Sequence, residues 1–132
     1  MKRRLEALAR IGKLQKQLHE LASWRLAQLG ARRDRLAEDE RAMLQAMGEG
    51  VSAYGAPAEA GLRRICGVEA DIAAADAAYA AQSRQAFAQG ARAKLAERAH
   101  DGLDARYRDQ KQRKELAELI ERSLGKPPSS SA

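Results

Sequence analysis

Proline is absent from two long stretches of this chain, residues 2–47 and residues 58–124. Only Gly12 and Gly30 interrupt the first stretch, which is rich in Leu, Ala, Arg, Gln and Glu. These residue types favour helix, whereas proline ends or kinks a helix. The arrangement therefore predicts two long helices joined by a loop over residues 48–57.

The composition argues against a thick globular core. Aromatic residues make up 4% of the 132 residues, and much of the 45% apolar content is alanine, which buries little area per residue. The 32% of charged residues, with abundant Ala, Glu, Lys, Leu and Arg, is typical of coiled coils. We therefore expect one all-α domain: a long antiparallel two-helix coiled-coil hairpin with a narrow contact seam.

The two predicted helices differ in length, which leaves part of the second one unpaired. If the chain folds back near Ala53, Met1 lies near Ala105, and the second helix overhangs the first over residues 106–124. The Pro/Ser-rich residues 125–132 are expected to form a disordered tail. The predicted C-terminal overhang carries an apolar stripe with no partner in the chain, formed by Leu116, Leu119, Ile120 and Leu124.

The spacing of the apolar residues in the first helix predicts a seam, the line of residues that contacts the second helix. The heptad frame of this seam shifts once. The first frame contains Ile11, Leu14, Leu18 and Leu21, spaced by three and four residues. The second contains Ala22, Leu26, Leu29, Arg33, Leu36, Glu40, Met43 and Met47. Successive steps of four residues between the frames would form a stutter, close to Trp24.

The second helix has one seam frame throughout. Its predicted positions are Leu62, Ile65, Val68, Ile72, Ala75, Tyr79, Gln82, Ala86, Ala93, Ala96, Leu103 and Tyr107. Steps of three and four residues along this set are typical of one helix face.

The sequence offers little catalytic chemistry. His19 and His100 are the only histidines, and Cys66 is the only cysteine, which excludes an intramolecular disulfide and a cysteine-based metal cluster. The Glu-x-x-His spacing of a di-iron bundle occurs once, at residues 97–100, without the second copy that such a site needs. No phosphate-binding or HExxH motif is present. We expect no enzyme activity, no cofactor and no metal.

Five side chains have competing interpretations. Trp24 either anchors a partner or fills the space at the stutter, and Tyr54 at the loop tip contacts a partner or packs on the loop. Phe87 and Tyr79 extend an aromatic surface patch, or Tyr79 belongs to the core, which its seam position favours. Cys66 is either a small buried residue or a reactive thiol, and we expect the former.

Positive charge is concentrated in the first helix. The net charge is +6, and residues 1–41 alone carry 11 Lys/Arg against 6 Asp/Glu. Such a surface favours an acidic partner or nucleic acid, and the interleaving of both signs favours an acidic protein surface. No apolar run approaches the 18 residues of a membrane span, so we expect a cytoplasmic protein.

The ends of the chain suggest a family. A basic, Leu-rich segment opens it at residues 2–11, and a charged Gln/Lys/Glu-rich helix closes it at residues 107–122. With its length and expected hairpin, the chain resembles the small coiled-coil stalk proteins of type III export, the flagellar FliJ-like proteins and their injectisome counterparts.

That resemblance implies a non-enzymatic stalk or adaptor, peripheral to the membrane export apparatus, that couples an export ATPase hexamer to the export gate. Some members bind export chaperones. By position, the ATPase-facing end corresponds to residues 2–15 and 100–124, and the gate-facing midsection to the region of Trp24 and Phe87. The implied partner-binding residues are Arg3, Arg4, Arg10, Trp24, Phe87, Lys111, Arg113, Lys114, Leu116, Leu119 and Ile120.

Two alternatives remain open at the level of sequence. The pI of 9.8 is compatible with a basic helical protein that binds nucleic acid, for which binding would weaken steeply with salt. The exposed stripe on the overhang is also compatible with a generic secretion chaperone or scaffold, in which the stripe closes a dimer or docks a client.

Overall fold

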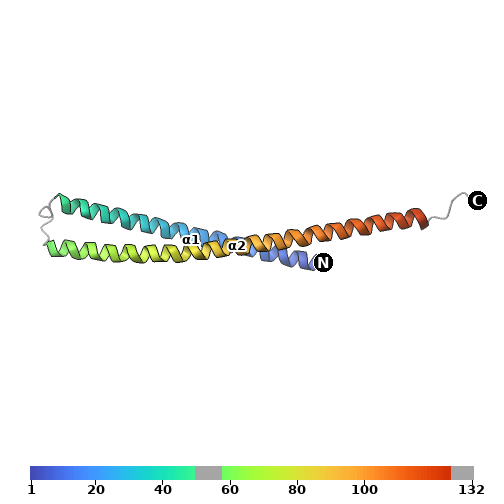
Figure 1. The fold of residues 1–132 in the computed structure, drawn as a ribbon, viewed down its shortest axis with the longest axis horizontal. Helices are drawn as coiled ribbons and strands as arrows, with labels where there is room; N and C mark the ends of the chain where they lie inside the picture. Colours follow the sequence, from blue (N-terminus) through green and yellow to red (C-terminus); the bar gives the residue numbers. More distant parts are fainter. Residues whose placement is uncertain (50–57, 126–132) are drawn as a thin grey trace, which may run out of the picture. The chain divides into compact units, whose positions relative to one another are not determined.

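The computed structural model describes residues 1–49 and 58–125, and all regular structure in these residues is α-helical (Figure 1). Helix α1 spans Lys2–Gly48 and helix α2 spans Ala58–Gly125. The two helices pack against each other, which confirms the prediction of an all-helical chain with two packed helices. Tyr54, most of the predicted loop and all but the first residue of the predicted tail lie outside the described residues.

The described chain divides into two units, of which residues 17–91 form one. In this unit the later part of α1 lies alongside the first part of α2 (Figure 1). The α2 residue number falls as the α1 number rises along this contact. The adjacent residues, written as α1/α2 pairs, are His19/Gly90, Ala22/Gln82, Gly30/Tyr79, Arg33/Asp76 and Met47/Gly61.

The core of this unit is narrow. Its buried apolar side chains are Ala22, Ile65, Ala75 and Ala86, with exposed fractions between 5% and 8%. Three of the four are alanines, so the helices approach closely and bury little apolar area at each layer. Half-buried residues, including Leu26, Leu29, Leu36, Val68 and Ile72, line the seam on either side of these four.

The other unit comprises residues 1–16 and the chain from Arg92 onward. Its described residues include none that is fully buried. The half-buried seam positions are Leu5, Leu8, Gly12 and Gln15 on α1, and Ala93, Ala96, His100, Leu103 and Tyr107 on α2. Beyond Tyr107, every α2 residue through Gly125 is exposed.

The predicted frame of the first half of α1 is wrong. Ile11, Leu14, Leu18 and Leu21 are exposed by 47%, 54%, 40% and 44%, so they do not form the seam. The frame predicted from Ala22 onward instead extends back through the seam positions of residues 5–19, without a stutter. The physical reason lies in α2: its half-buried positions keep steps of three and four residues throughout, so a frame shift in α1 would have no matching shift to pack against.

Two predictions on α2 also need correction. Leu62 is 55% exposed, and the half-buried position next to it is Gly61. Cys66 is exposed, because it follows the buried Ile65 by one residue and a step of one residue turns a helical side chain away from its neighbour's face. Tyr79, in contrast, is half-buried at the seam, as predicted.

Candidate partner-binding surfaces

The last turns of α2 form a fully exposed helical segment, residues 108–125, which we name the C-terminal arm. Its apolar residues Leu116, Leu119 and Ile120 are exposed by 58%, 58% and 48%, and Leu124 by 80%. Spacings of three and four residues place these side chains along one side of the helix. A stripe of this kind is a candidate contact surface for another molecule.

Six of the predicted partner-binding cations lie in the same unit as the arm. All are exposed, and they are Arg3, Arg4 and Arg10 on α1 and Lys111, Arg113 and Lys114 on α2. Arg113 Nε lies 3.2 Å from Asp109 Oδ2, one helical turn away. An exposed pair of this kind is worth only a few tenths of a kcal/mol, so Arg113 can exchange it for a partner's carboxylate at small cost.

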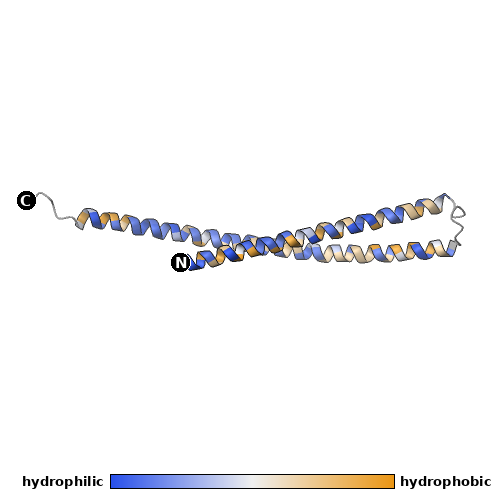
Figure 2. Cartoon of the chain, turned by 180° about the vertical axis from the view of Figure 1, so that it is seen from behind, coloured by the Kyte–Doolittle hydropathy of each residue, from blue (hydrophilic) through white to orange (hydrophobic). Residues whose placement is uncertain are grey.

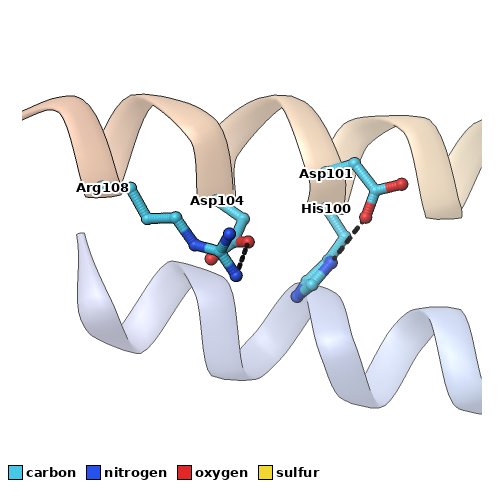
Figure 3. Close-up of polar contacts among 4 residues, drawn as sticks. All are labelled: His100, Asp101, Asp104 and Arg108. Atoms are coloured by element: carbon cyan, nitrogen blue, oxygen red, sulfur yellow. Dashed lines mark hydrogen bonds and ion pairs between the residues drawn. The ribbon is translucent and has the colours of Figure 1, made fainter.

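Two polar contacts lie at the start of the arm and just before it (Figure 3). Arg108 Nη2 lies 3.1 Å from Asp104 Oδ2, and His100 Nδ1 lies 3.2 Å from Asp101 Oδ1. The His100 ring points toward α1 and is half-buried, at a seam position of α2 (Figure 3). His100 is therefore a seam residue whose ring nitrogen Nδ1 has a polar partner in its sequence neighbour, Asp101.

The two predicted midsection residues, Trp24 and Phe87, are both highly exposed. Trp24 is 59% exposed and Phe87 is 82% exposed. Because the α1 seam has no stutter, the interpretation of Trp24 as a filler there is wrong. Tryptophan is enriched at binding hot spots and phenylalanine at protein interfaces, so both remain candidates for contact with a partner.

Sequence reasoning missed the exposure of four apolar residues of α1, which we name the α1 stripe: Ile11 and Leu14 in one unit, and Leu18 and Leu21 in the other. Their regular spacing predicts a place in the seam, yet all four are exposed. One signal was available in the sequence. The frame through Leu5 and Leu8 joins that of Leu26 and Leu29 in unbroken steps of three and four residues, whereas the α1 stripe does not.

The part of the seam next to the α1 stripe contains polar side chains and leaves little free space between them. His19 Nδ1 is buried and makes no hydrogen bond with the residues that the structure describes. A methyl group placed on Gly90 would lie 2.9 Å from Cε1 of His19, so the ring occupies the space that the glycine leaves. Nearby, Gln82 Nε2 donates a hydrogen bond of 3.1 Å to the carbonyl oxygen of Ala22. This stretch therefore packs through polar groups and glycine, not through leucine.

Arg33 connects the two helices further along. Its guanidinium carbon lies 4.1 Å from the centre of the Tyr79 ring, and its Nε lies 3.9 Å from carboxylate oxygens of both Asp34 and Asp76. The Tyr79 ring in turn covers Gly30, where an added methyl group would lie 3.3 Å from Cε2. Arg33 therefore contacts α2 by stacking on the Tyr79 ring and by its charge. In other turns of α1, leucine occupies the equivalent seam position.

We expect Arg33→Ala to lower the free energy of unfolding by about 1 kcal/mol, through loss of the cation–π contact, the ion pair with Asp76 and the packing of its stem. Urea unfolding followed by circular dichroism measures this. The matched control is Arg32→Ala, because Arg32 is exposed on the same helix and its loss should change the free energy by less than about 0.5 kcal/mol. Equal effects of the two substitutions would contradict the assignment of Arg33 to the packed seam between the helices.

Metal-ligating clusters and membrane-spanning segments are both absent from the described residues. Among residues 1–49 and 58–125, no group of His, Cys, Asp and Glu is arranged to hold a metal ion. Within the same residues, neither helix has a segment long and apolar enough to cross a membrane.

Comparison with known proteins adds no assignment: no family model, no curated protein and no solved structure matches this chain.

Proposed function

We propose that this chain is a non-enzymatic stalk or adaptor of a type III, flagellar-type protein export apparatus, which couples the export ATPase ring to the export gate. The observation that carries the proposal is the C-terminal arm, where a helix continues fully exposed with an apolar stripe along one side. A helix that presents such a stripe has a ready surface for a groove or a pore.

The proposed architecture is an antiparallel coiled-coil hairpin in which α2 overhangs α1. The falling α2 numbers of the adjacent pairs support an antiparallel course, and the seam spacing of three and four residues supports coiled-coil packing. The uniform exposure of residues 108–125 supports the overhang. In this arrangement, residues 2–15 and 100–124 form the end that meets the ATPase.

The proposed contact with the ATPase combines charge and apolar burial. Arg3, Arg4, Arg10, Lys111 and Lys114 would attract an acidic pore and speed association, while Leu119 and Ile120 would supply buried apolar area. The stalk would act by binding some conformations of the ring better than others, which is the only way a binding protein shifts such an equilibrium.

The other proposed contacts follow the body of the hairpin. Trp24 and Phe87 would meet the export gate or an export chaperone, and the protein would act at the cytoplasmic face of the apparatus without inserting into the membrane. Their exposure supports this part of the proposal.

A binding assay with a purified export ATPase from the same organism tests the proposal. We expect the unmodified chain to bind and Leu119→Asp to weaken binding at least about tenfold, because a carboxylate replaces apolar contact area at the centre of the stripe. The matched control is Leu95→Asp, which introduces the same charge at another exposed leucine of α2, 64% exposed, and should bind normally.

Two results would contradict the proposal. If the unmodified chain does not bind the ATPase at low salt, the stalk function is wrong. If Leu119→Asp and Leu95→Asp bind equally well, the C-terminal arm is not the contact surface.

A further inference from the structure

Three arginines in the unit of residues 17–91 lie in one row along α1. We name Arg25, Arg32 and Arg35 the arginine row. All three are exposed, and steps of seven and three residues keep them on one side of the helix, beside the seam. None of them makes an ion pair with the residues that the structure describes. The row is therefore a line of uncompensated positive charge about 15 Å long, at 1.5 Å per residue.

The nearest carboxylates of this stretch lie on the other side of the helix pair. Arg33, a seam residue, has its Nε 3.9 Å from carboxylate oxygens of both Asp34 and Asp76. Asp34 of α1 and Asp76 of α2 therefore mark one side of the pair. Because a helix turns by about 100° per residue, Arg32 and Arg35 project to the opposite side of the α1 seam. Negative and positive charge are thus separated across this unit.

The part of α2 beside the arginine row has small side chains on the same side. Ala74, Ala78 and Ala81 are exposed and lie on the side of the α2 seam opposite to Asp76. The contact between Arg33 and Asp76 brings this part of α2 level with the row. Figure 2 shows the contrast, because the first part of α2 is mainly pale orange and α1 beside it has many blue positions. Since alanine ends at Cβ, another chain can approach α2 closely here while it reaches the arginines.

Apolar side chains continue the arginine row at one end. Leu18 and Leu21 precede Arg25 in steps of three and four residues, belong to the same unit, and are 40% and 44% exposed. At the other end the acidic Asp39 follows Arg35 by one helical turn. A phosphate backbone would gain nothing from the leucines, whereas a protein helix can present carboxylates and apolar side chains in one line. The row therefore favours a protein partner over nucleic acid.

We propose that the arginine row, together with Leu18 and Leu21, binds an acidic amphipathic helix of a partner protein, which lies along α1 and against the alanines of α2. Its carboxylates face the three arginines, and its apolar side chains cover the two leucines. An arginine can hold a carboxylate through two parallel hydrogen bonds, which fixes the position of the bound helix. This surface is separate from the C-terminal arm, so the proposal goes beyond the export contacts proposed above.

The expected complex is weak and sensitive to salt. Exposed ion pairs each contribute little to affinity and are screened as the ionic strength rises. We therefore expect a dissociation constant in the micromolar range at low salt, and weaker binding when salt is added.

Two synthetic helical peptides test the proposal against the full chain. Each carries two leucines and three glutamates with the spacing of Leu18, Leu21 and the arginine row, in this order in one peptide and in the reverse order in the other. The pair samples both directions of the bound helix. We expect at least one peptide to bind in fluorescence anisotropy, and its counterpart with glutamine in place of glutamate to bind at least about tenfold more weakly.

Charge reversal in the chain locates the bound peptide. Arg32→Glu/Arg35→Glu should weaken binding at least about tenfold, because each substitution replaces an attraction by a repulsion. The matched control is Arg63→Glu/Arg84→Glu, which makes the same change of charge at two exposed arginines on the outer face of α2 in the same unit. The control should bind within about threefold of the unmodified chain. Since all four positions are exposed, circular dichroism should show unchanged helix content.

Three results would overturn the proposal. Neither glutamate peptide binds at low salt; or the two charge-reversal variants bind the peptide equally well; or a single-stranded oligonucleotide binds more tightly than the peptides and Leu18→Ser/Leu21→Ser leaves peptide binding unchanged, which would assign the row to nucleic acid. Because the assay contains no export component, its outcome is independent of the binding to an export ATPase.

Discussion

Ala86→Asp is expected to lower the free energy of unfolding by on the order of 3 kcal/mol, because it places a charge in the packed seam between the helices. Ala86 is the most deeply buried residue described, at 5% exposure, and sits where α1 and α2 are packed through small side chains. A carboxylate at this position loses its hydration, and the buried side chains of the described core are all apolar. The helices must separate locally to rehydrate it, which exposes the neighbouring core.

The matched control is Ala88→Asp, two residues further along the same helix. Ala88 is exposed, so the same added charge should cost only the difference in helix propensity, up to about 0.7 kcal/mol. Urea unfolding of both variants at neutral pH, followed by circular dichroism, measures the difference. If the two variants unfold at the same urea concentration, the helix face containing Ala86 is not the packed one.

The seam of α2 was predictable from the sequence because one frame there carries most of the large apolar side chains. Ile65, Val68 and Ile72 set the frame, and Ala75 and Ala86 continue it in steps of three and four residues. The frame through Cys66, Ala70, Ala73 and Ala77 is also uncharged, but it offers only small side chains to bury. Where a single face satisfies the hydrophobic pattern, spacing alone identifies the buried side of a helix.

The seam of α1 was not predictable by the same rule, because its first half offers two faces. Leu14 and Leu18 lie on the more apolar face, whereas the packed face contains Gln15 and His19. The hydrophobic pattern alone favours burial of the face that contains Leu14 and Leu18. The packed face of α1, however, follows one unbroken frame along the helix. The frame set by Leu26 therefore extends through residues whose own side chains do not favour burial.

The candidate surfaces were predictable to different degrees. The apolar stripe of the C-terminal arm follows from the unequal lengths of the two helices, which can be read from the positions of proline and glycine. The α1 stripe could be identified only from the exposure of each side chain in the structure, because its apolar pattern is equally compatible with a place inside or outside the seam. The exposure of Trp24 depended on the same choice of frame.

Gly90→Ala is expected to lower the free energy of unfolding by about 1–2 kcal/mol, although alanine is the better helix former. The added methyl group would lie 2.9 Å from Cε1 and 3.2 Å from Nδ1 of His19. The imidazole ring is half-buried between the helices, so it must leave its position or push α1 away from α2. The cost of that displacement is expected to exceed the gain in helix propensity.

Gly67→Ala is the control, since a methyl group there meets nothing within 4 Å, and it should raise the free energy of unfolding by up to about 1 kcal/mol. In a His19→Ala background the clash is removed, so Gly90→Ala should become stabilising, as Gly67→Ala is. This change of sign, measured in a double-mutant cycle, isolates the contact between the two residues. A Gly90→Ala variant that is as stable as Gly67→Ala in the unmodified background would show that His19 does not fill the space beside Gly90, and the polar packing assigned to this part of the seam would be wrong.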